Sequence, residues 1–575
     1  MHILYGGVSL NMNILVPNIN HRGQKVLPFE VRHKAYARPL AAIVKRPNDM
    51  KRTYIIILVL LTSYYCKSQV IEQDSLALVA IYNSTNGDIW TNNNHWLNYP
   101  VGLWFGIEVY NNRVVKINLN CNNLSGYIPA EIGGLDSLSC FSIYYNSIDS
   151  ISPSTGNCAI LDTLMISSNP IQFLPPEIGD LSNLKYFNFG NTEITSLPEE
   201  IGGLTNLEYL LGENGILQNI PESIGSMTSL KEIDLSLNNI SNLPSSIGNC
   251  TNLTRLQVNA NEISSVPTEI GNLSNLEILI LGGNNISELP EEIFTLTNLW
   301  KLNFAANNLN NISPSIGNLV NLENFQFFSN EFESIPEEIG NCVSLDYING
   351  YSNKIGSLPL SLLDLPFVQT LYLRYNKLTF DDIEPLVSIN GFEYMDQDSI
   401  GYCIDTTLYL NDSFYIEIQT GGEFNQYQWF KNGDTIVGAT NSFLEFQNLN
   451  YADSGEYHCI VTNTIATGLT LYSRVVTLYI IDPLNISEEE SDLSFYVYPN
   501  PSHDKIFIRT PEKNNFKNIN INFYNQYGGC VKSHKTMNSN LFEIDILELD
   551  KGLYLIQLIN ENNQAIGKTK KLIVL

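Results

Sequence analysis

The sequence has few basic residues and only one apolar run of any length. It holds 31 Lys and Arg against 59 Asp and Glu, for a formal net charge of −28. We expect no nucleic-acid partner, because binding to a phosphate backbone requires clustered cations. The apolar run from Tyr54 to Tyr65 is shorter than the roughly 20 residues that cross a bilayer, so we also expect no membrane span.

Residues with catalytic or metal-binding chemistry are also sparse. The 7 His are scattered, and the 9 Cys include no C-x-x-C pair of the kind that holds zinc. Neither a G-x-S-x-G motif nor a phosphate-binding loop is present. We therefore expect no catalytic residues, no metal and no cofactor, and an enzyme is the disfavoured class of function.

The segment 50–68 has the pattern of a secretory signal peptide. Met50-Lys51-Arg52 gives a basic start, the apolar run follows, and the small residues Cys66 and Ser68 stand near a cleavage point. Because such a leader normally begins at the first Met, we interpret residues 1–49 as a mis-annotated upstream extension. An unusually long leader is the alternative.

The most regular feature is the phrase L-x-x-L-x-L-x-x-N-x-I, which returns every 23 residues and is present twelve times within residues 114–395. Its alternation places Leu on one face of a short strand and the intervening residues on the other. Asn suits the following turn, where its amide can satisfy backbone groups. Only Thr192 and Gly215 replace that Asn. The strands are predicted to stack as one parallel sheet, and an array of helices is excluded by the Gly and Pro of every repeat.

This phrase, with the P-x-x-I-G-x-L that follows it, resembles the leucine-rich repeat family in its plant-type and bacterial forms. The resemblance implies an α/β leucine-rich-repeat solenoid, a horseshoe built on a parallel sheet. Cys158, Cys250 and Cys342 stand where other repeats have an apolar residue such as Leu273. We expect them to be core thiols rather than metal ligands or disulfide partners.

Residues 69–113 precede the first repeat and are expected to cap the open end of the solenoid. They contain a helical pattern from Asp74 to Asn83 and then Trp90, Trp96 and Trp104. This segment is similar to the N-terminal cap of plant-like repeat proteins, without the cysteines of that cap. The three Trp are expected to form the core of the cap, and a sugar-binding platform is the alternative.

Beyond the repeats, residues 396–482 show short alternating strands. Trp429 and the string D-x-G-x-Y-x-C ending at Cys459 resemble two strands of an immunoglobulin-like sandwich, in which the Trp fills the core and the Tyr makes a corner hydrogen bond. Phe414, Ile416 and Ile418 stand where the partner cysteine belongs, so Cys459 is expected to be unpaired. Cys403 lies too far upstream to serve as that partner.

The end of the chain follows an acidic linker at 483–492 and reads as a small β-sandwich over 493–575. Tyr498-Pro499-Asn500-Pro501, Gly528-Gly529, Gly552-x-Tyr554 and a basic terminus near Lys571 resemble the C-terminal sorting domain of type IX secretion substrates. The resemblance implies export by the type IX secretion machinery of a Bacteroidetes-type bacterium, with the chain secreted or kept on the cell surface.

Ligand contacts are expected on the outward side of the sheet, because solenoids use their concave face for binding. The outward side chains are the third, fifth and seventh of each repeat, counted from its first apolar residue. Aromatic and basic side chains are the hot-spot types among them; the predicted ligand-binding residues are Tyr186, Tyr209, Phe328, Tyr347, Tyr351, Tyr372 and Arg374. An ordinary strand preference for Tyr is the alternative reading.

The predicted function is that of a secreted surface protein in adhesion or a similar interaction, binding a protein or polysaccharide ligand through this face. A structural surface or matrix component without a specific ligand is the alternative. The paired acids of the L/I-P-E-E-I phrase, such as Glu199 and Glu200, recur with the repeat, so they are interpreted as turn residues rather than as an acid/base pair.

Overall fold

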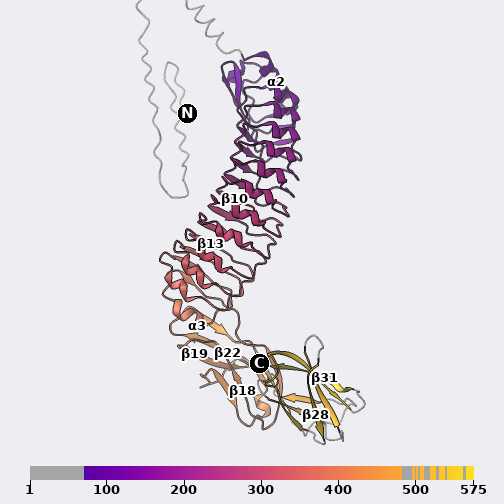
Figure 1. Ribbon diagram of the computed structural model, residues 1–575, viewed down its shortest axis with the longest axis vertical. Coiled ribbons are helices and arrows are strands. Elements are labelled where there is room, and N and C mark those ends of the chain that lie inside the picture. Colours follow the sequence, from indigo (N-terminus) through magenta and orange to yellow (C-terminus); the bar gives the residue numbers. More distant parts are fainter. Residues whose placement is uncertain are drawn as a thin grey trace, which may run out of the picture. The chain divides into compact units, whose positions relative to one another are not determined.

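The computed structural model describes residues 70–481, 495–498, 500, 502, 505–510, 518–525, 530–537, 541–560 and 565–574. The predicted extension 1–49, signal peptide 50–68 and linker 483–492 lie outside these residues. Within them, a long solenoid sheet precedes several smaller β-sheets (Figure 1). The predicted fold class is thereby confirmed. None of the described helices is long and apolar enough to cross a membrane.

Every repeat contributes one short strand to a single 14-stranded sheet. Adjacent strands pair in parallel at constant register, as when Leu256 of one repeat lies opposite Leu279 of the next. The twelve predicted repeats supply β2 (Arg113–Asn118), β4 (Cys140–Ser142), β6 (Thr163–Met165), β7 (Tyr186–Asn188), β8 (Tyr209–Leu211), β9 (Glu232–Asp234), β10 (Arg255–Gln257), β11 (Ile278–Ile280), β12 (Lys301–Asn303), β13 (Asn324–Gln326), β14 (Tyr347–Asn349) and β15 (Thr370–Tyr372).

The two edge strands of this sheet come from outside the regular repeats. β1 (Ile107–Tyr110) pairs antiparallel with β2, and β16 (Phe392–Glu393) extends the sheet in parallel beyond β15. The sequence phrase did not predict β16, because the segment before it lacks the Leu spacing. Beside the sheet, β3 (Ser125–Ile128) and β5 (Ser147–Ile151) pair in parallel as a second small sheet.

The segment that carries the P-x-x-I-G phrase forms a short 3₁₀-helix in each of the first eleven repeats. In the regular case Pro is the N-cap, because its ring fixes φ near the −69° found at Pro244 and Pro267, and the Ile is buried, as Ile247 and Ile270 are. The helices are η3 (Ala130–Gly134), η4 (Pro153–Asn157), η5 (Pro176–Asp180), η6 (Glu199–Gly203), η7 (Glu222–Ser226), η8 (Ser245–Asn249), η9 (Thr268–Asn272), η10 (Glu291–Thr295), η11 (Pro314–Asn318), η12 (Glu337–Asn341) and η13 (Leu360–Asp364).

The buried interior of the solenoid is made of the Leu rows and of the thiols predicted to lie there. Cys158, Cys250 and Cys342 are fully buried and free. Each Sγ approaches the carbonyl oxygen of an Ile one repeat earlier, at 3.1 Å for Cys342. Their role as core thiols is therefore confirmed.

The Asn of each repeat closes the turn after its strand. The amide of Asn261 donates to the carbonyl oxygens of Leu235 and Val258, both at 3.0 Å, and its Oδ1 accepts from the N–H of Ile240 at 2.9 Å. Each such side chain therefore joins two consecutive repeats and satisfies buried backbone groups that would otherwise stay unpaired. The Thr192 hydroxyl makes only one comparable bond, to Phe189 O at 2.8 Å.

The N-terminal cap is α2 (Glu72–Ser84) with the short helices η1 (Gly87–Ile89) and η2 (Val101–Leu103). Trp90, Trp96 and Trp104 are at most 6% exposed and pack against one another, so their prediction as cap core is confirmed. Because the indole rings are buried, they are not available to a sugar, and the alternative of a sugar-binding platform is not supported.

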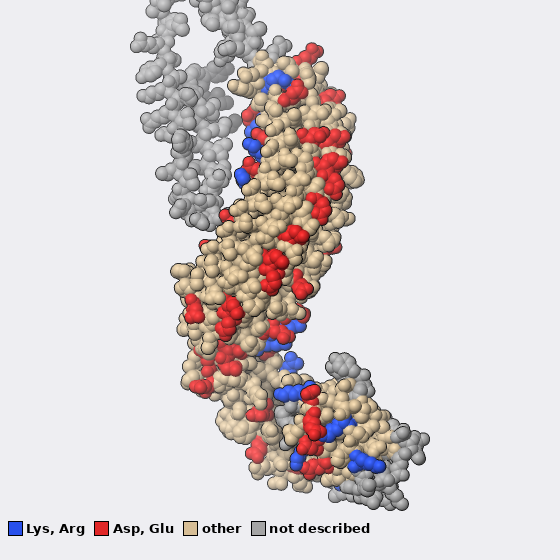
Figure 2. Space-filling view, viewed as in Figure 1, with Lys and Arg blue, Asp and Glu red and all other residues tan. Residues whose placement is uncertain are grey.

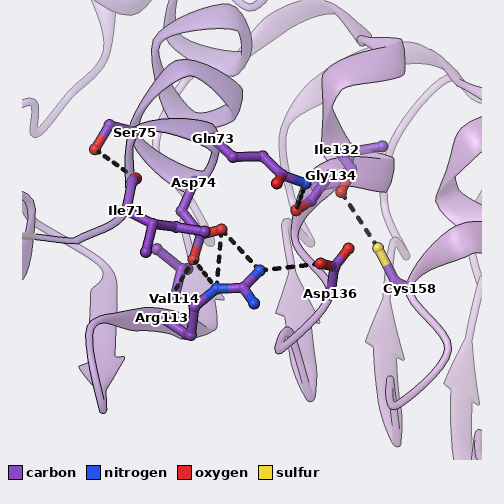
Figure 3. A network of polar contacts seen from close by, with 10 residues as sticks. All are labelled: Ile71, Gln73, Asp74, Ser75, Arg113, Val114, Ile132, Gly134, Asp136 and Cys158. Atoms are coloured by element: carbon purple, nitrogen blue, oxygen red, sulfur yellow. Dashed lines mark hydrogen bonds and ion pairs between the residues drawn. The ribbon is translucent and has the colours of Figure 1, made fainter.

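A buried ion pair fixes the cap to the first repeat. Asp74 is fully buried and accepts from the guanidinium of Arg113 at 3.0 and 3.1 Å and from the N–H of Val114 at 2.7 Å (Figure 3). Arg113 Nη2 also reaches the exposed Asp136 at 3.4 Å. The carboxylate of Asp74 is thus fully paired, as a buried charge must be.

After the solenoid, α3 (Phe380–Ile383) and η14 (Glu384–Leu386) lead to a two-sheet unit. One sheet has the order β17-β24-β22-β19-β20 with β23 beside β22, and the other pairs β18 with β21. The bounds are β17 (Ile404–Tyr409), β18 (Phe414–Glu417), β19 (Asn425–Lys431), β20 (Asp434–Thr435), β21 (Phe443–Phe446), β22 (Gly455–Asn463), β23 (Thr470–Tyr472) and β24 (Val476–Ile481), with η15 (Tyr451–Asp453) before β22.

The core of this unit has the predicted residues. Trp429 and Cys459 are fully buried, and Ile416 and Ile418 are 6% exposed. The Tyr457 hydroxyl donates to the carbonyl oxygen of Asp453 at 2.7 Å, which is the expected corner bond. Cys459 is free, as predicted.

The C-terminal strands form two further sheets with a core of their own. One has the order β25-β26-β29 and the other β28-β27-β30-β31. The bounds are β25 (Tyr496–Tyr498), β26 (Lys505–Arg509), β27 (Asn518–Tyr524), β28 (Cys530–Met537), β29 (Leu541–Asp545), β30 (Gly552–Ile559) and β31 (Ala565–Val574).

Candidate ligand-binding face

The candidate site is the outward face of the solenoid sheet. The middle residue of each three-residue strand points into the core, so its two neighbours point outward. None of the seven predicted ligand-binding residues is buried. Parallel pairing at constant register stacks equivalent positions of successive repeats, about 4.8 Å apart, so outward side chains of adjacent strands can touch.

The predicted C-terminal aromatic residues come together on β13 to β15. Tyr347 lies beside Tyr372 edge to face, with ring centroids 5.9 Å apart. Tyr351 makes a similar edge contact at 5.1 Å with Tyr375. Phe328 lies two residues beyond the end of β13 and is partly exposed. We call Phe328, Tyr347, Tyr351, Tyr372 and Tyr375 the aromatic cluster.

Tyr375 was missed by the sequence reasoning. It follows the strand at the eighth position of its repeat, which was not counted as outward. Its φ is 56°, and this left-handed backbone turns the side chain onto the outer face. The signal was available, because the eighth residue has positive φ in every repeat, from Cys121 to Tyr375, but periodicity alone does not report φ.

The predicted cation of this region is already paired. Arg374 Nε donates to Asp396 Oδ2 at 3.1 Å, and Nη1 lies 3.9 Å from Glu393 Oε2. The hydrogen bond with Asp396 raises the pKa of the Arg374 guanidinium. Its charge is therefore compensated within the chain.

Tyr186 and Tyr209 form a separate pair. Their ring centroids lie 5.9 Å apart on β7 and β8. Five strand steps separate β8 from β13, or about 24 Å. The structure therefore brings five of the seven predicted residues into one region and leaves these two in another.

Between the two groups the outward face is charged and internally paired. Lys231 Nζ meets Glu208 at 2.6 Å, Arg255 meets Glu232 at 3.6 Å, and Gln257 donates to Asp234 at 2.6 Å. The hydrogen bond from Lys231 lowers the pKa of Glu208. Such partly exposed pairs add little stability. Arg255 with Glu232 and Gln257 with Asp234 occupy the polar groups of β9 and β10, while Lys231 and Glu208 stand at the second position of their repeats, on the flank.

The acidic turn residues lie elsewhere. Glu199, Glu200, Glu291 and Glu292 are exposed on the 3₁₀-helices η6 and η10. Figure 2 shows acidic side chains recurring along the solenoid. These glutamates stand in the first turn of their 3₁₀-helices and recur with the repeat.

Comparison with known families identifies two parts of the chain. Residues 246–345 match the leucine-rich repeat region, 160–216 and 229–250 match leucine-rich repeats, and 496–575 match the secretion system C-terminal sorting domain. No curated protein sequence matches the chain.

Solved structures agree on the solenoid. PEPR1-AtPEP1 is 25% identical with a TM-score of 0.51, over 59% of this chain and 49% of that one. A leucine-rich repeat protein of Leptospira interrogans is 29% identical with a TM-score of 0.43, over 46% and 68%. The Arabidopsis receptor kinase HAESA ectodomain is 23% identical with a TM-score of 0.47, over 59% and 62%. This chain thus spans about half to two thirds of each. The chain has the fold of a leucine-rich repeat solenoid, and its residues 496–575 match a secretion system C-terminal sorting domain.

Proposed function

We propose that the chain is a secreted, cell-surface protein that binds a protein or glycan through the outward face of its solenoid, as in adhesion. The observation that carries the proposal is the sorting domain at 496–575 on the same chain as partly exposed aromatic and amide side chains in one stacked row. A sorting domain of this kind directs a chain to the cell surface or beyond it. Exposed Tyr side chains supply large contact area with polar tips.

The unit at 396–482 serves in this proposal as an immunoglobulin-like spacer. Its two-sheet arrangement, the buried Trp429 and the corner bond of Tyr457 support this assignment. The proposed protein has no catalytic role, since its recurrent acid pairs lie exposed in turns.

A purely structural surface component is the second candidate. The paired charges of β9 and β10 favour it, because their polar groups are already satisfied within the chain. A structural protein would show no saturable ligand whose binding depends on the aromatic cluster.

The test of export is mass spectrometry of the native protein from its producing cells, fractionated into cytosol, surface and medium. We expect a surface or medium form that begins near residue 69 and lacks the sorting domain. A cytosolic chain retaining both Met1 and Leu575 would contradict export and favour an intracellular scaffold.

A further inference from the structure

The C-terminal third of the outward face differs from the rest in charge. On β11 to β14, the third, fifth and seventh positions hold one charged residue, Lys301, whereas Glu213, Glu232, Asp234 and Arg255 stand at such positions in the three repeats before. Carboxylates near β13 and β14, Glu323 and Asp346, stand at the second position, on the flank. An uncharged strip thus lies on a chain whose net charge is −28.

The strip carries a row of amides that are held in place by one another. Asn303 Nδ2 donates to Gln326 Oε1 at 3.2 Å, and Gln326 Nε2 donates to Asn324 Oδ1 at 2.7 Å. Asn349 Oδ1 accepts from the N–H of Tyr351 at 3.2 Å. Among the described residues, Asn324 Nδ2 has no intramolecular acceptor, so this row presents oriented donor capacity to a ligand.

The aromatic cluster flanks these amides. In the pairs Tyr347–Tyr372 and Tyr351–Tyr375 the rings meet edge to face, at 84° and 70°, so each pair covers only one face of one of its rings. Tyr351 and Tyr375 are 40% and 46% exposed. A ligand with an apolar ring face and peripheral hydroxyls would contact both the rings and the amides.

Charge decides between ligand classes. An acidic ligand is commonly held by several cations, but within the described residues the strip has a single one beside it, Lys301 opposite Asn324. Arg374 is paired with Asp396 and Glu393. Protein partners are commonly selected and steered by complementary charge, which this strip lacks. We propose that the strip, formed by Asn324, Gln326, Tyr347, Asn349, Tyr351 and Tyr372, binds an uncharged glycan. This inference rests on the proposed function and names its ligand.

The test is affinity gel electrophoresis of the full chain against uncharged polysaccharides (mannan, β-glucan and galactomannan) and against acidic alginate. We expect retardation by at least one uncharged polysaccharide, unchanged between low and high salt, and none by alginate. Tyr347→Ala with Tyr372→Ala should weaken binding by roughly thirtyfold, the loss expected for a binding hot spot. The same two positions changed to Phe should retain most of the affinity.

A matched control separates this site from others. Thr370→Ala, on β15 beside Tyr347, should leave binding unchanged. If circular dichroism shows that the double Ala variant does not fold, Asn324→Ala is used in its place, and we expect a measurable loss of polysaccharide affinity. Unchanged polysaccharide binding by the double Ala variant or by Asn324→Ala contradicts the inference. Salt-sensitive binding to alginate alone also contradicts it. If the chain binds a purified surface protein but no polysaccharide, the glycan inference is wrong and the proposed function stands. If it binds neither a protein nor a polysaccharide, both the inference and the proposed function are wrong.

Discussion

At the scale of single residues, the Asn of the repeat does more than terminate a strand. Asn238, Asn261 and Asn284 each donate to a carbonyl one repeat earlier and accept an N–H from the earlier turn. Leaving such backbone groups buried without a partner costs about 1–3 kcal/mol each. The Asn ladder is thus a component of solenoid stability, and its two gaps, Thr192 and Gly215, fall in adjacent repeats.

Asn261→Ala is expected to lower the free energy of unfolding by about 2 kcal/mol. The N–H of Ile240 loses its acceptor, and the carbonyl oxygens of Leu235 and Val258 each lose one of two amide donors. The matched control is Asn252→Ala, at the end of the preceding repeat. Its exposed amide makes one bond, to Thr228 O at 2.8 Å, so its loss should cost under about 1 kcal/mol. Urea unfolding measures both, and equal losses would contradict the ladder's role.

The buried thiols predict a dependence of stability on alkaline pH. Burial raises the pKa of Cys158 and Cys342 to about 12 and of Cys250 to about 11, from an ordinary 9.0. Above pH 9 the unfolded chain loses these protons while the native chain keeps them, so stability is full below pH 9 and falls as pH rises toward 11 or 12. The slope is about 1.4 kcal/mol per pH unit for each thiol.

Urea midpoints at pH 8 and pH 10 test this. The variant with all three thiols changed to Ala should be less stable at pH 8, because cavities form, yet lose less stability between the two pH values. Changing the exposed Cys403 to Ala should leave the wild-type slope in place. An unchanged slope in the triple variant would show that other groups carry the alkaline transition.

At the scale of elements, the distance between successive 3₁₀-helices depends on a residue without a side chain. A Cβ on Gly248 would stand 2.4 Å from Glu269 O, and one on Gly179 would stand 2.0 Å from Glu200 O. Two helices differ at the equivalent position: Phe294 in η10, whose ring is buried, and Leu363 in η13, which is exposed. The repeat that contains Phe294 therefore keeps its core with a large side chain where most others have a close backbone approach.

Gly248→Ala is expected to destabilise the solenoid by about 2 kcal/mol, since the new methyl group meets backbone that cannot move away cheaply. Gly356→Ala is the control, because the atoms nearest its Cβ are 4.0 Å away. Its effect should stay within about 0.5 kcal/mol. Thermal unfolding of the two variants measures the difference, and similar melting temperatures would argue against the close approach.

The cap is expected to depend on its buried ion pair. Asp74→Ala leaves Arg113 and the N–H of Val114 without their acceptor, at a cost of about 3 kcal/mol. Asp136→Ala removes a carboxylate whose side chain is 61% exposed, so it should cost less than about 1 kcal/mol. Hydrogen exchange would show faster exchange in α2 and β2 for the first variant only. Equal protection in both would contradict a role for Asp74 in holding the cap.

At the scale of the whole molecule, the part of the chain that the structure describes has two separate hydrophobic cores. One runs through the solenoid and the following two-sheet unit, and the other belongs to the sorting domain, with Phe495, Ile521 and Ile556 among its buried residues. A domain with its own core can be removed without opening the other. This is the organisation that removal of a sorting domain after export requires.

Deletion of residues 491–575 is therefore expected to leave the main thermal transition of the remaining chain within a few degrees of its value in the full chain. Differential scanning calorimetry would show a smaller transition lost and the larger one kept. Collapse of the larger transition would mean that the sorting domain stabilises the solenoid.

The sequence by itself determined the repeat, its register and most of the core, because a side-chain period of 23 residues leaves one way to bury the Leu rows. It also indicated the sorting domain, and it predicted that Trp429 and the three thiols lie in the interior.

Only the tertiary structure decided which outward residues contact one another. Parallel stacking of β14 and β15 places Tyr347 against Tyr372. The left-handed backbone of Tyr375 places its ring beside Tyr351. Asp396, which follows β16, pairs with Arg374. Those contacts depend on backbone angles and on pairing across repeats, which spacing along the chain does not encode.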